Sequence, residues 1–287
     1  MTGTNENAST ERDPGGRAAD RLVATELVAH GDATIEARVY ATHADVGEWV
    51  TLVPSLGRGA ADFTEEFGST LTRDLVEAGY RVVLIEPRGF GRSTGSFAAV
   101  SMEDLADDLK AVVDALGIAE VHVVGHAFGN RLARSFAAFH PDDVADVVLL
   151  AAGGDFELSA EQRRNLVVST NPEGDPTERR DAIGRAFFAE GNDPDIWLDG
   201  WSFELAMAQA GAVQTIDPAF FKRAGGKDIL VVQPSEDAIA PPELAGRVLA
   251  EELGDQVTLV EVERAGHALL PEQPEAVTAA LLEFYAR

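Results

Sequence analysis

The stretch from Val121 to Arg134, VHVVGHAFGNRLAR, has the spacing of a turn that presents a nucleophile. An apolar run ends in Gly-x-x-x-Gly and passes directly into a helical pattern. In the motif G-x-S-x-G, the serine lies on a sharp strand-to-helix turn and attacks the substrate. The middle residue here is Ala127, whose methyl group cannot attack anything. Either this turn is not a nucleophile elbow, or it is one whose nucleophile has been lost, removed or replaced.

Two later loops carry further side chains with chemical potential. VVQPSEDAIAPPE places Asp237 after one apolar run, and VERAGHALLPEQPEAV places His267 after the last one. An imidazole titrates near ~6.5, so a histidine can act as a general base at neutral pH. Both residues also have structural interpretations, because Asp237 could cap a following helix and a lone histidine in a loop is often only hydrogen-bonded in place.

The surrounding pattern indicates how these loops are positioned. Two alternating runs, RLVATELVAH and ATIEARVYAT, flank the turn signal His30-Gly31-Asp32 and predict a hairpin. After them, short Val/Ile/Leu-rich runs alternate with helical patterns, which we expect over 62–77, 102–116, 128–139, 241–253 and 274–285. Ser101 and Asp104 have the spacing of a capping box before the second of these helices. The alternation predicts a doubly wound α/β fold with a mostly parallel sheet covered on both faces.

Three regions are expected along the chain. Residues 1–20 are polar, lack the apolar core of a signal peptide and read as a disordered tail. Residues 21–155 and 224–287 are expected to form the α/β core. Residues 156–223 show helical patterns without a comparable strand and predict a helical cap over the carboxyl ends of the strands. This cap contains Trp197 and Trp201, and we expect at least one of them to line a pocket.

In combination these motifs resemble the α/β-hydrolase fold family from about residue 22 to the end. The resemblance rests on the elbow, on EPRGFGRST before it, on EDAIAPPE and on GHALLPEQPEAV, together with the chain order nucleophile, acid, histidine. It implies that Asp237 accepts a hydrogen bond from the ring of His267 and stabilises its protonated form. The backbone N–H groups of Phe128 and Leu56 would form the oxyanion hole.

The chain departs from the family pattern at two positions. Ala127 replaces the nucleophile, and Pro54-Ser55 stands where His-Gly often follows the third strand. An engineered serine-to-alanine change would explain only the first departure, so a native alanine is preferred, as in a subgroup with alanine at the elbow that GHAFGNRLAR also resembles. Ser55 is a candidate substitute nucleophile, although a serine after proline is more often a turn residue.

Further side chains are assigned more weakly. Ser55, His126, Trp197 and Trp201 are the candidates for contact with substrate, with His126 favoured as a support of the elbow. Arg58 and Arg88 could bind an acidic substrate group, but surface ion pairs are the expected explanation for both.

These features leave three functions open. The first is an enzyme that acts on a small organic substrate through the His267–Asp237 dyad and the oxyanion hole, by non-covalent hydrolysis, elimination, C–C cleavage or cofactor-free oxygenation. The second is a serine esterase inactivated by Ala127, and the third is a non-catalytic small-molecule-binding protein. Loss of a serine nucleophile costs on the order of 10⁶ in turnover, so ordinary acyl-enzyme catalysis is closed to the sequence as it stands.

Composition excludes several other classes. The chain contains no cysteine, which rules out disulfides and thiolate chemistry, and no His/Asp/Glu cluster has metal-ligand spacing. GRGAAD and GFGRST lack a dinucleotide-site context, so no cofactor is expected. A net charge of −26 disfavours nucleic acid and anionic membranes as partners. No apolar run reaches the ~18 residues of a membrane span, and a soluble, cytoplasmic protein of undetermined oligomeric state is expected.

Lysine occurs only at Lys110, Lys222 and Lys227, although Lys and Arg total 23. An acidic, lysine-poor surface suits a high-salt cytoplasm, in which screening reduces self-repulsion. A GC-rich genome produces the same composition, and both explanations stay open.

Overall fold

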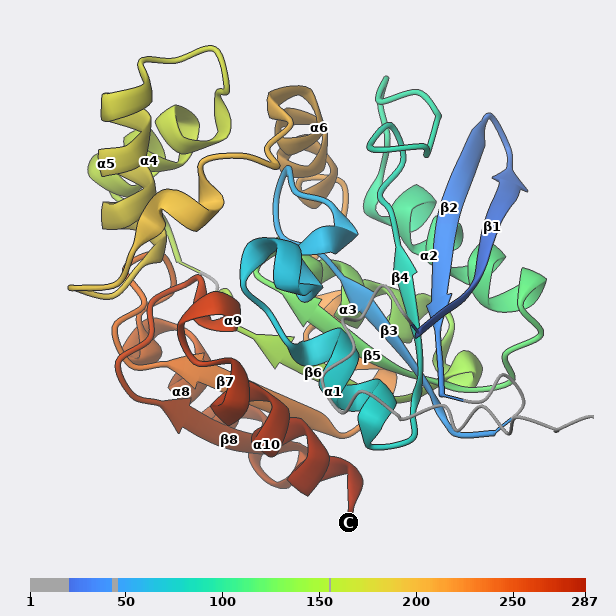
Figure 1. Cartoon of the computed structure of the whole chain (residues 1–287). Coiled ribbons are helices and arrows are strands. Elements are labelled where there is room, and N and C mark those ends of the chain that lie inside the picture. The colour runs from blue at the N-terminus through green and yellow to red at the C-terminus, as the bar shows by residue number, and fades with distance from the viewer. Residues whose placement is uncertain (1–20, 43–45, 155) are drawn as a thin grey trace, which may run out of the picture.

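Eight strands form one sheet in the order β1-β2-β4-β3-β5-β6-β7-β8 (Figure 1). This computed structural model describes residues 21–42, 46–154 and 156–287, so the tail expected over 1–20 lies outside the described residues. The strands are β1 (Leu22–His30), β2 (Ala33–Tyr40), β3 (Trp49–Val53), β4 (Arg81–Ile85), β5 (Val121–His126), β6 (Val144–Leu150), β7 (Ile229–Pro234) and β8 (Val257–Val262).

The sheet is mostly parallel, as the alternation of strands and helices predicts. The pairs β1·β2 and β2·β4 are antiparallel, and every later neighbouring pair is parallel. The predicted hairpin is confirmed, with His30 opposite Ala33 across the Gly31 turn. Gly31 has a φ of 57°, a conformation that glycine adopts without steric cost.

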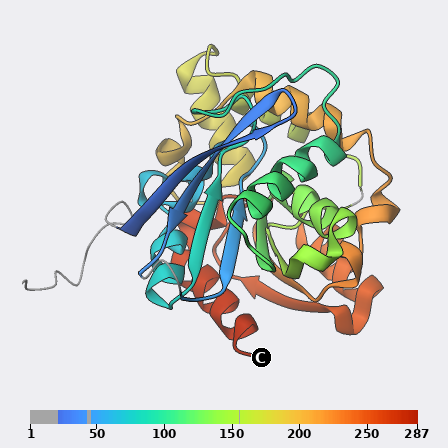
Figure 2. The ribbon, with the colours of Figure 1, turned by 90° about the vertical axis from the view of Figure 1, so that its right-hand side faces the viewer.

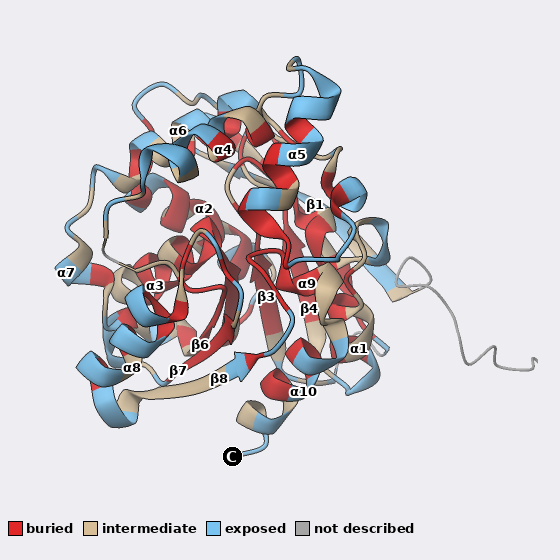
Figure 3. Ribbon diagram, turned by 90° about the vertical axis from the view of Figure 1, so that its left-hand side faces the viewer, coloured by how far each residue is buried: buried red, intermediate tan, exposed pale blue. Residues whose placement is uncertain are grey.

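Both faces of the central strands are buried, which explains their continuous apolar runs. In β6, Val147 and Leu149 belong to one core cluster, whereas Val148 and Leu150 belong to the other. This is the two-residue alternation of a pleated strand. Figure 3 shows the central strands buried and β8 at the sheet edge mostly at intermediate exposure.

Helices cover the two faces. Residues of α2, α3 and α8 join the first cluster, and residues of α1 and α10 join the second. Figure 2 shows α2 and α3 beside each other on one face of the sheet. The helices are α1 (Leu71–Glu77), α2 (Met102–Ala115), α3 (Phe128–Phe139), α4 (Ala160–Thr170), α5 (Pro176–Phe187), α6 (Phe203–Val213), α7 (Pro218–Phe221), α8 (Gly246–Leu253), α9 (Leu269–Glu272) and α10 (Pro274–Tyr285).

Most helix predictions agree with the structure. The helices expected over 128–139 and 274–285 have these bounds, and the Ser101–Asp104 capping box is present at the start of α2. The helix expected over 62–77 is wrong, because Gly68 at φ 81° interrupts it and only α1 is an α-helix there. The helix expected from 241 begins instead at Gly246, since Ala245 has a non-helical φ of −128° and ψ of −99°.

Residues 156–223, where a cap is expected, contain α4 to α7 and lie between β6 and β7 in the chain. Figure 1 shows α4, α5 and α6 above the sheet. Part of this region has its own buried cluster, which includes Ile183, Phe187 and Trp197. In the described part of the chain, no helix has both the length and the apolar character needed to cross a membrane.

The start of α3 packs backbone against backbone. A Cβ on Gly125 would lie 2.2 Å from the carbonyl oxygen of Gly129, and a Cβ on Gly129 would lie 2.2 Å from that of Val53. Both distances are shorter than real Cβ contacts, so a side chain at either position would force the neighbouring backbone to move. This close approach brings the end of β3 against the turn that joins β5 to α3.

We therefore expect Gly129→Ala to lower the free energy of unfolding by at least about 1–3 kcal/mol, because backbone atoms must move to accept the methyl group. Urea unfolding measures the change. Gly211→Ala is the matched control, since Gly211 lies in α6 with no atom within 4 Å of its added Cβ. In that helix interior, alanine should stabilise by about 0.5–1 kcal/mol. Equal effects of the two substitutions would contradict this account.

Candidate active site

Ala127 lies at the turn between β5 and α3 in a rare backbone conformation. Its φ is 53° and its ψ is −109°. A non-glycine residue in such a region costs of the order of 1–3 kcal/mol and persists only where the surroundings hold it. Its N–H donates to the carbonyl of Leu150 at 3.0 Å, and its own carbonyl accepts from the N–H of Asn130 at 3.0 Å. The local geometry is that of a strained strand-to-helix elbow.

The structure brings His267 and Asp237 together. Nδ1 of His267 lies 2.8 and 3.0 Å from the two carboxylate oxygens of Asp237. Both side chains are buried. Asp237 Oδ1 also accepts from the backbone N–H groups of Ile239 and Ala240, at 2.9 and 2.7 Å. The same carboxylate therefore holds its own turn and orients the imidazole. The alternative that Asp237 caps the following helix is wrong, because the next helical turn, Pro242–Leu244, has Pro241 at its N-cap and no side-chain cap.

A cavity of about 300 Å³ opens beside these residues. His267, Ala127, Ser55 and Trp201 all border it. Its remaining wall is mostly apolar and includes Leu56, Phe128, Phe156, Leu158, Leu166, Phe187, Val213 and Ile239. Small-molecule sites have this character, with apolar walls and a few polar groups.

Two backbone donors adjoin the cavity. Phe128 begins α3, where the first N–H groups of a helix have no partner within the helix. Leu56 follows β3 on the opposite side of the elbow. Within the described residues, the N–H groups of Phe128 and Leu56 have no protein acceptor. Both residues border the cavity, as an oxyanion hole requires.

Two of the predicted substrate contacts lie behind the cavity wall. His126 and Trp197 are fully buried and are not among the cavity's lining residues. His126 Nε2 donates to the carbonyl of His267 at 2.8 Å, and the Trp201 indole donates to the carbonyl of Trp197 at 2.6 Å. Of the two tryptophans, Trp201 therefore lines the cavity and Trp197 supports it.

Arg58 and Arg88 are not surface residues, so the expected surface ion pairs are wrong in location. Arg58 is completely buried, with Nε 2.8 and 2.7 Å from the two oxygens of Asp62. Its guanidinium also lies over the rings of Phe67, Trp197 and Trp201. Arg88 is buried against Asp108, with two contacts of 2.8 Å. Since burial costs a charge its hydration, each arginine retains an acidic partner.

Glu272 is a site residue that the sequence analysis missed. One oxygen accepts from the N–H of Gly266, which precedes the histidine, at 2.7 Å, and the other accepts from the N–H of Ala189 at 2.8 Å. The N–H of Ala268 completes the connection by donating to the carbonyl of Phe187 at 2.7 Å. Burial raises the pKa of the Glu272 carboxyl. These bonds hold the histidine loop against residues 187–189, and no local sequence signal marks them.

The described residues contain no group of three or more His, Asp or Glu side chains arranged to hold a metal ion. His122 donates from Nδ1 to the carboxylate of Asp146 at 2.8 Å and packs its ring 4.4 Å from that of Tyr285. It lies away from the cavity lining.

His126 gives the site a testable pH dependence. Burial, together with the charge of nearby His267, lowers the pKa of His126 to about 3. An unfolded histidine titrates near ~6.5, so the unfolded state binds the proton first. The stability contributed by neutral His126 is complete above about pH 6.5 and falls by about 1.4 kcal/mol per pH unit as the pH drops toward 3. Urea unfolding between pH 7 and 4 should therefore show a smaller decrease in the free energy of unfolding for His126→Gln than for the unmodified protein.

His122→Gln is the control of opposite sign. Burial alone would lower the pKa of His122, but the bond and charges of Asp146 and Glu48 outweigh it and raise that pKa. Protonated His122 therefore stabilises the fold at acid pH, and this contribution is lost as the pH rises through its folded pKa. His122→Gln should therefore make the free energy of unfolding fall more steeply as the pH decreases. A change in the same direction in both variants would refute the assignment.

Comparison with known proteins gives relatives of the same kind. The family model described as alpha/beta hydrolase fold matches residues 48–180. A protein named "Putative carbamate hydrolase RutD" from Variovorax paradoxus is 30% identical over 262 residues, which cover 84% of this chain and 92% of that one. A 2-hydroxy-6-oxononadienedioate/2-hydroxy-6-oxononatrienedioate hydrolase from Klebsiella pneumoniae is 39% identical over 110 residues, 38% of each chain.

Solved structures agree at the level of the fold. The 2-hydroxy-6-oxo-6-phenylhexa-2,4-dienoate hydrolase from Rhodococcus superposes with a TM-score of 0.74 at 21% identity, covering 92% of this chain and 99% of that one. The bromoperoxidase from Bacillus anthracis also has a TM-score of 0.74, at 20% identity over 92% and 100% of the two chains. The sheet order, the elbow and a relative that spans most of both chains together show that this chain belongs to the α/β-hydrolase fold family.

Proposed function

We propose that this chain is an enzyme in which the His267–Asp237 pair acts as general base on a small organic carbonyl compound, without a covalent intermediate. The observation that carries the proposal is the buried imidazole. Its Nδ1 lies 2.8 and 3.0 Å from the oxygens of Asp237, and its ring borders a 300 Å³ apolar cavity. Ala127 offers no nucleophile at the elbow.

The hydrogen bonds assign the protons. A carboxylate can only accept, so Nδ1 of His267 carries the ring hydrogen and Nε2 keeps its lone pair. In the described part of the chain, Nε2 has no hydrogen-bond partner, which leaves it available to a bound molecule. The negative charge of Asp237 stabilises the imidazolium that forms when Nε2 accepts a proton.

Hydrolysis is the reaction that this arrangement serves most directly. Nε2 of His267 removes a proton from a water molecule, and the resulting hydroxide attacks the carbonyl carbon. The oxyanion then accepts hydrogen bonds from the N–H groups of Phe128 and Leu56, of which the first also lies at the positive end of α3. Collapse of the intermediate expels the leaving group, which takes the proton back from His267. Two relatives named as hydrolases support this choice over elimination or oxygenation.

The cavity walls suggest how the substrate is held. A site of about 300 Å³ with mostly apolar lining suits a small organic molecule. We assign Ser55 and Trp201 to direct contact, and His126 and Trp197 to support of the wall. Residues 156–223 supply Trp201 and much of the lining, and we propose that they act as the cap.

A serine hydrolase scaffold without its serine is the second candidate. The φ of 53° and ψ of −109° at Ala127 favour it, since this is a conformation that a serine nucleophile would use. Such a protein would retain only about 10³–10⁴ of rate enhancement over water. The two candidates predict different responses to restoring the hydroxyl.

The deciding experiment measures kcat and KM for the unmodified protein, His267→Ala and Ala127→Ser, with p-nitrophenyl esters, carbamates and oxo acids as substrates. We expect the unmodified protein to turn over at least one class without a burst, and His267→Ala to lower kcat/KM by about 10²–10⁴, the contribution of a general base. His140→Ala is the control, because His140 pairs with Asp107 outside the cavity lining.

Two other outcomes would contradict this proposal. No turnover by the unmodified protein, together with burst-phase ester hydrolysis by Ala127→Ser, would replace this proposal with the second candidate. A loss of turnover on the order of 10⁶ in Ser55→Ala is the size expected for a nucleophile, and it would identify Ser55 as the nucleophile.

A further inference from the structure

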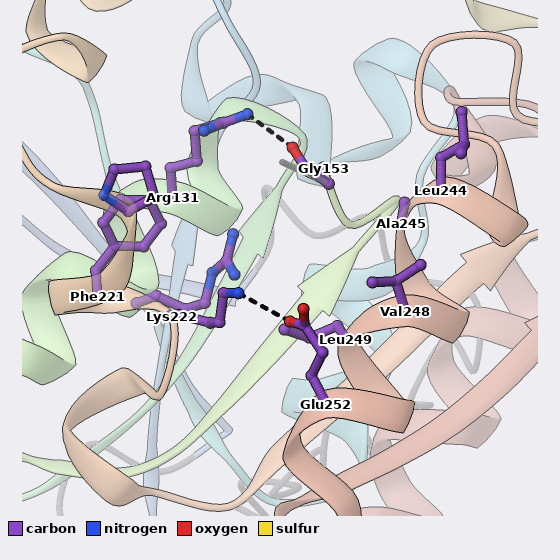
Figure 4. Close-up of a pocket in the computed structure, with 12 residues that line it drawn as sticks. Arg131, Gly153, Phe221, Lys222, Leu244, Ala245, Val248, Leu249 and Glu252 are labelled. Carbon is purple, nitrogen blue, oxygen red and sulfur yellow. Dashed lines mark hydrogen bonds and ion pairs between the residues drawn. The ribbon is translucent and has the colours of Figure 1, made fainter. Parts of the chain in front are cut away.

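A second cavity, of about 150 Å³, adjoins the proposed reaction cavity (Figure 4). Arg131, Gly153 and Gly154 line both, so the two spaces share a wall. Its other sides come from α7, from Lys222 directly after that helix, and from α8, which contributes Glu252. A volume several times the roughly 10–15 Å³ that one water requires is sufficient for a small ligand.

The unusual group in this cavity is Arg134. Arg134 is only 4% exposed, yet among the described residues no carboxylate forms an ion pair with it. Nε donates to the carbonyl of Asn130 in its own helix at 3.2 Å, and the guanidinium lies 5.1 Å from the centre of the Phe221 ring. Its terminal nitrogens have no protein acceptor among the described residues. Buried charges are normally paired, so this arginine lacks a counter-charge.

Two other cationic side chains line the cavity. These are Arg131 and Lys222, and Glu252 is the one acidic side chain among the described residues of the lining. Glu252 is already 2.8 Å from Lys222 Nζ, so it does not neutralise Arg134. Burial and the charge of Arg131 lower the pKa of Arg134 to about 9, which still leaves it protonated at neutral pH. A cationic cavity stands out in a chain whose net charge is −26.

We propose that this cavity binds a carboxylate or phosphate group, with the guanidinium of Arg134 as its principal partner and Lys222 as the second. A planar guanidinium offers paired N–H donors that match either oxyanion. Two sources can supply the group: a free small anion, or the acidic end of a molecule whose apolar part occupies the reaction cavity. Binding itself does not depend on the proposed reaction.

Thermal unfolding with added orthophosphate tests the site, at an ionic strength held constant with chloride. A ligand that binds only the folded state raises the melting temperature in a saturable way. We expect this rise in the unmodified protein, its loss in Arg134→Met, and an apparent Kd raised at least about tenfold in Lys222→Met, where Glu252 loses its partner. Lys227→Met, the same change outside the cavity lining, should behave like the unmodified protein.

Arg134→Met also has an expected effect on the melting temperature when no ligand is added. Since it replaces an unpaired buried charge by an apolar chain, its melting temperature in chloride should equal or exceed that of the unmodified protein. Should this variant fail to fold, Lys222→Met carries the test. An equal phosphate response in all variants, or none in the unmodified protein, would overturn the proposal.

A second pair of ligands distinguishes the two sources. Octanoate and octanol have the same chain but only the first carries a carboxylate. Tighter binding of octanoate than of octanol, lost in Lys222→Met, would show that one molecule spans both cavities. Equal binding of the two, with the phosphate response retained, would assign the cavity to a free anion. In either case His267→Ala should leave the orthophosphate response unchanged, because His267 does not line the second cavity, and this separates the site from the proposed catalysis.

Discussion

The close approach of three backbone segments at Gly125, Gly129 and Val53 is the constraint from which the site follows. Because no side chain can separate these segments, α3 starts directly against the end of β3. That contact places the loop with Ser55 and Leu56 opposite the first turn of α3. It also fixes the turn at Ala127. The packing around this residue offsets a backbone strain of the order of 1–3 kcal/mol.

Arg58 joins residues 156–223, the proposed cap, to the core through contacts that the sequence does not predict. Its charge is buried between Asp62 on one side and Phe67, Trp197 and Trp201 on the others, and Nη1 donates to the carbonyl of Asp199. The carbonyl of Asp199 lies 141 positions away from Arg58 in the chain. An arginine four residues before an aspartate reads as a surface pair, because local spacing carries no information about what covers it.

The sequence predicts features that depend on local signals, and it does not predict those that depend on contacts between distant segments. The ends of α3 and α10 and the capping box of α2 follow from local signals, since caps, prolines and apolar periodicity act within a few residues. The pairing of His267 with Asp237 is implied by the resemblance to the α/β-hydrolase fold family, which rests in part on the chain order of the loops. Glu272, Arg134 and the buried position of Trp197 depend on contacts between segments far apart in the chain, and no periodicity encodes them.

The elbow and the dyad differ in how much they say about function. Backbone packing alone can maintain the strain at Ala127, so a protein that had lost its chemistry would still keep the elbow. No comparable packing demand fixes the dyad. A buried carboxylate beside a buried imidazole costs hydration, and apolar residues of similar volume would fill the space at no loss of stability. In the structure, one oxygen of Asp237 accepts hydrogen bonds from two backbone N–H groups, and both oxygens lie within hydrogen-bond distance of His267. The proposed role of His267 as a base beside an open cavity would account for this cost, which is why the proposed function rests on His267 and not on the elbow.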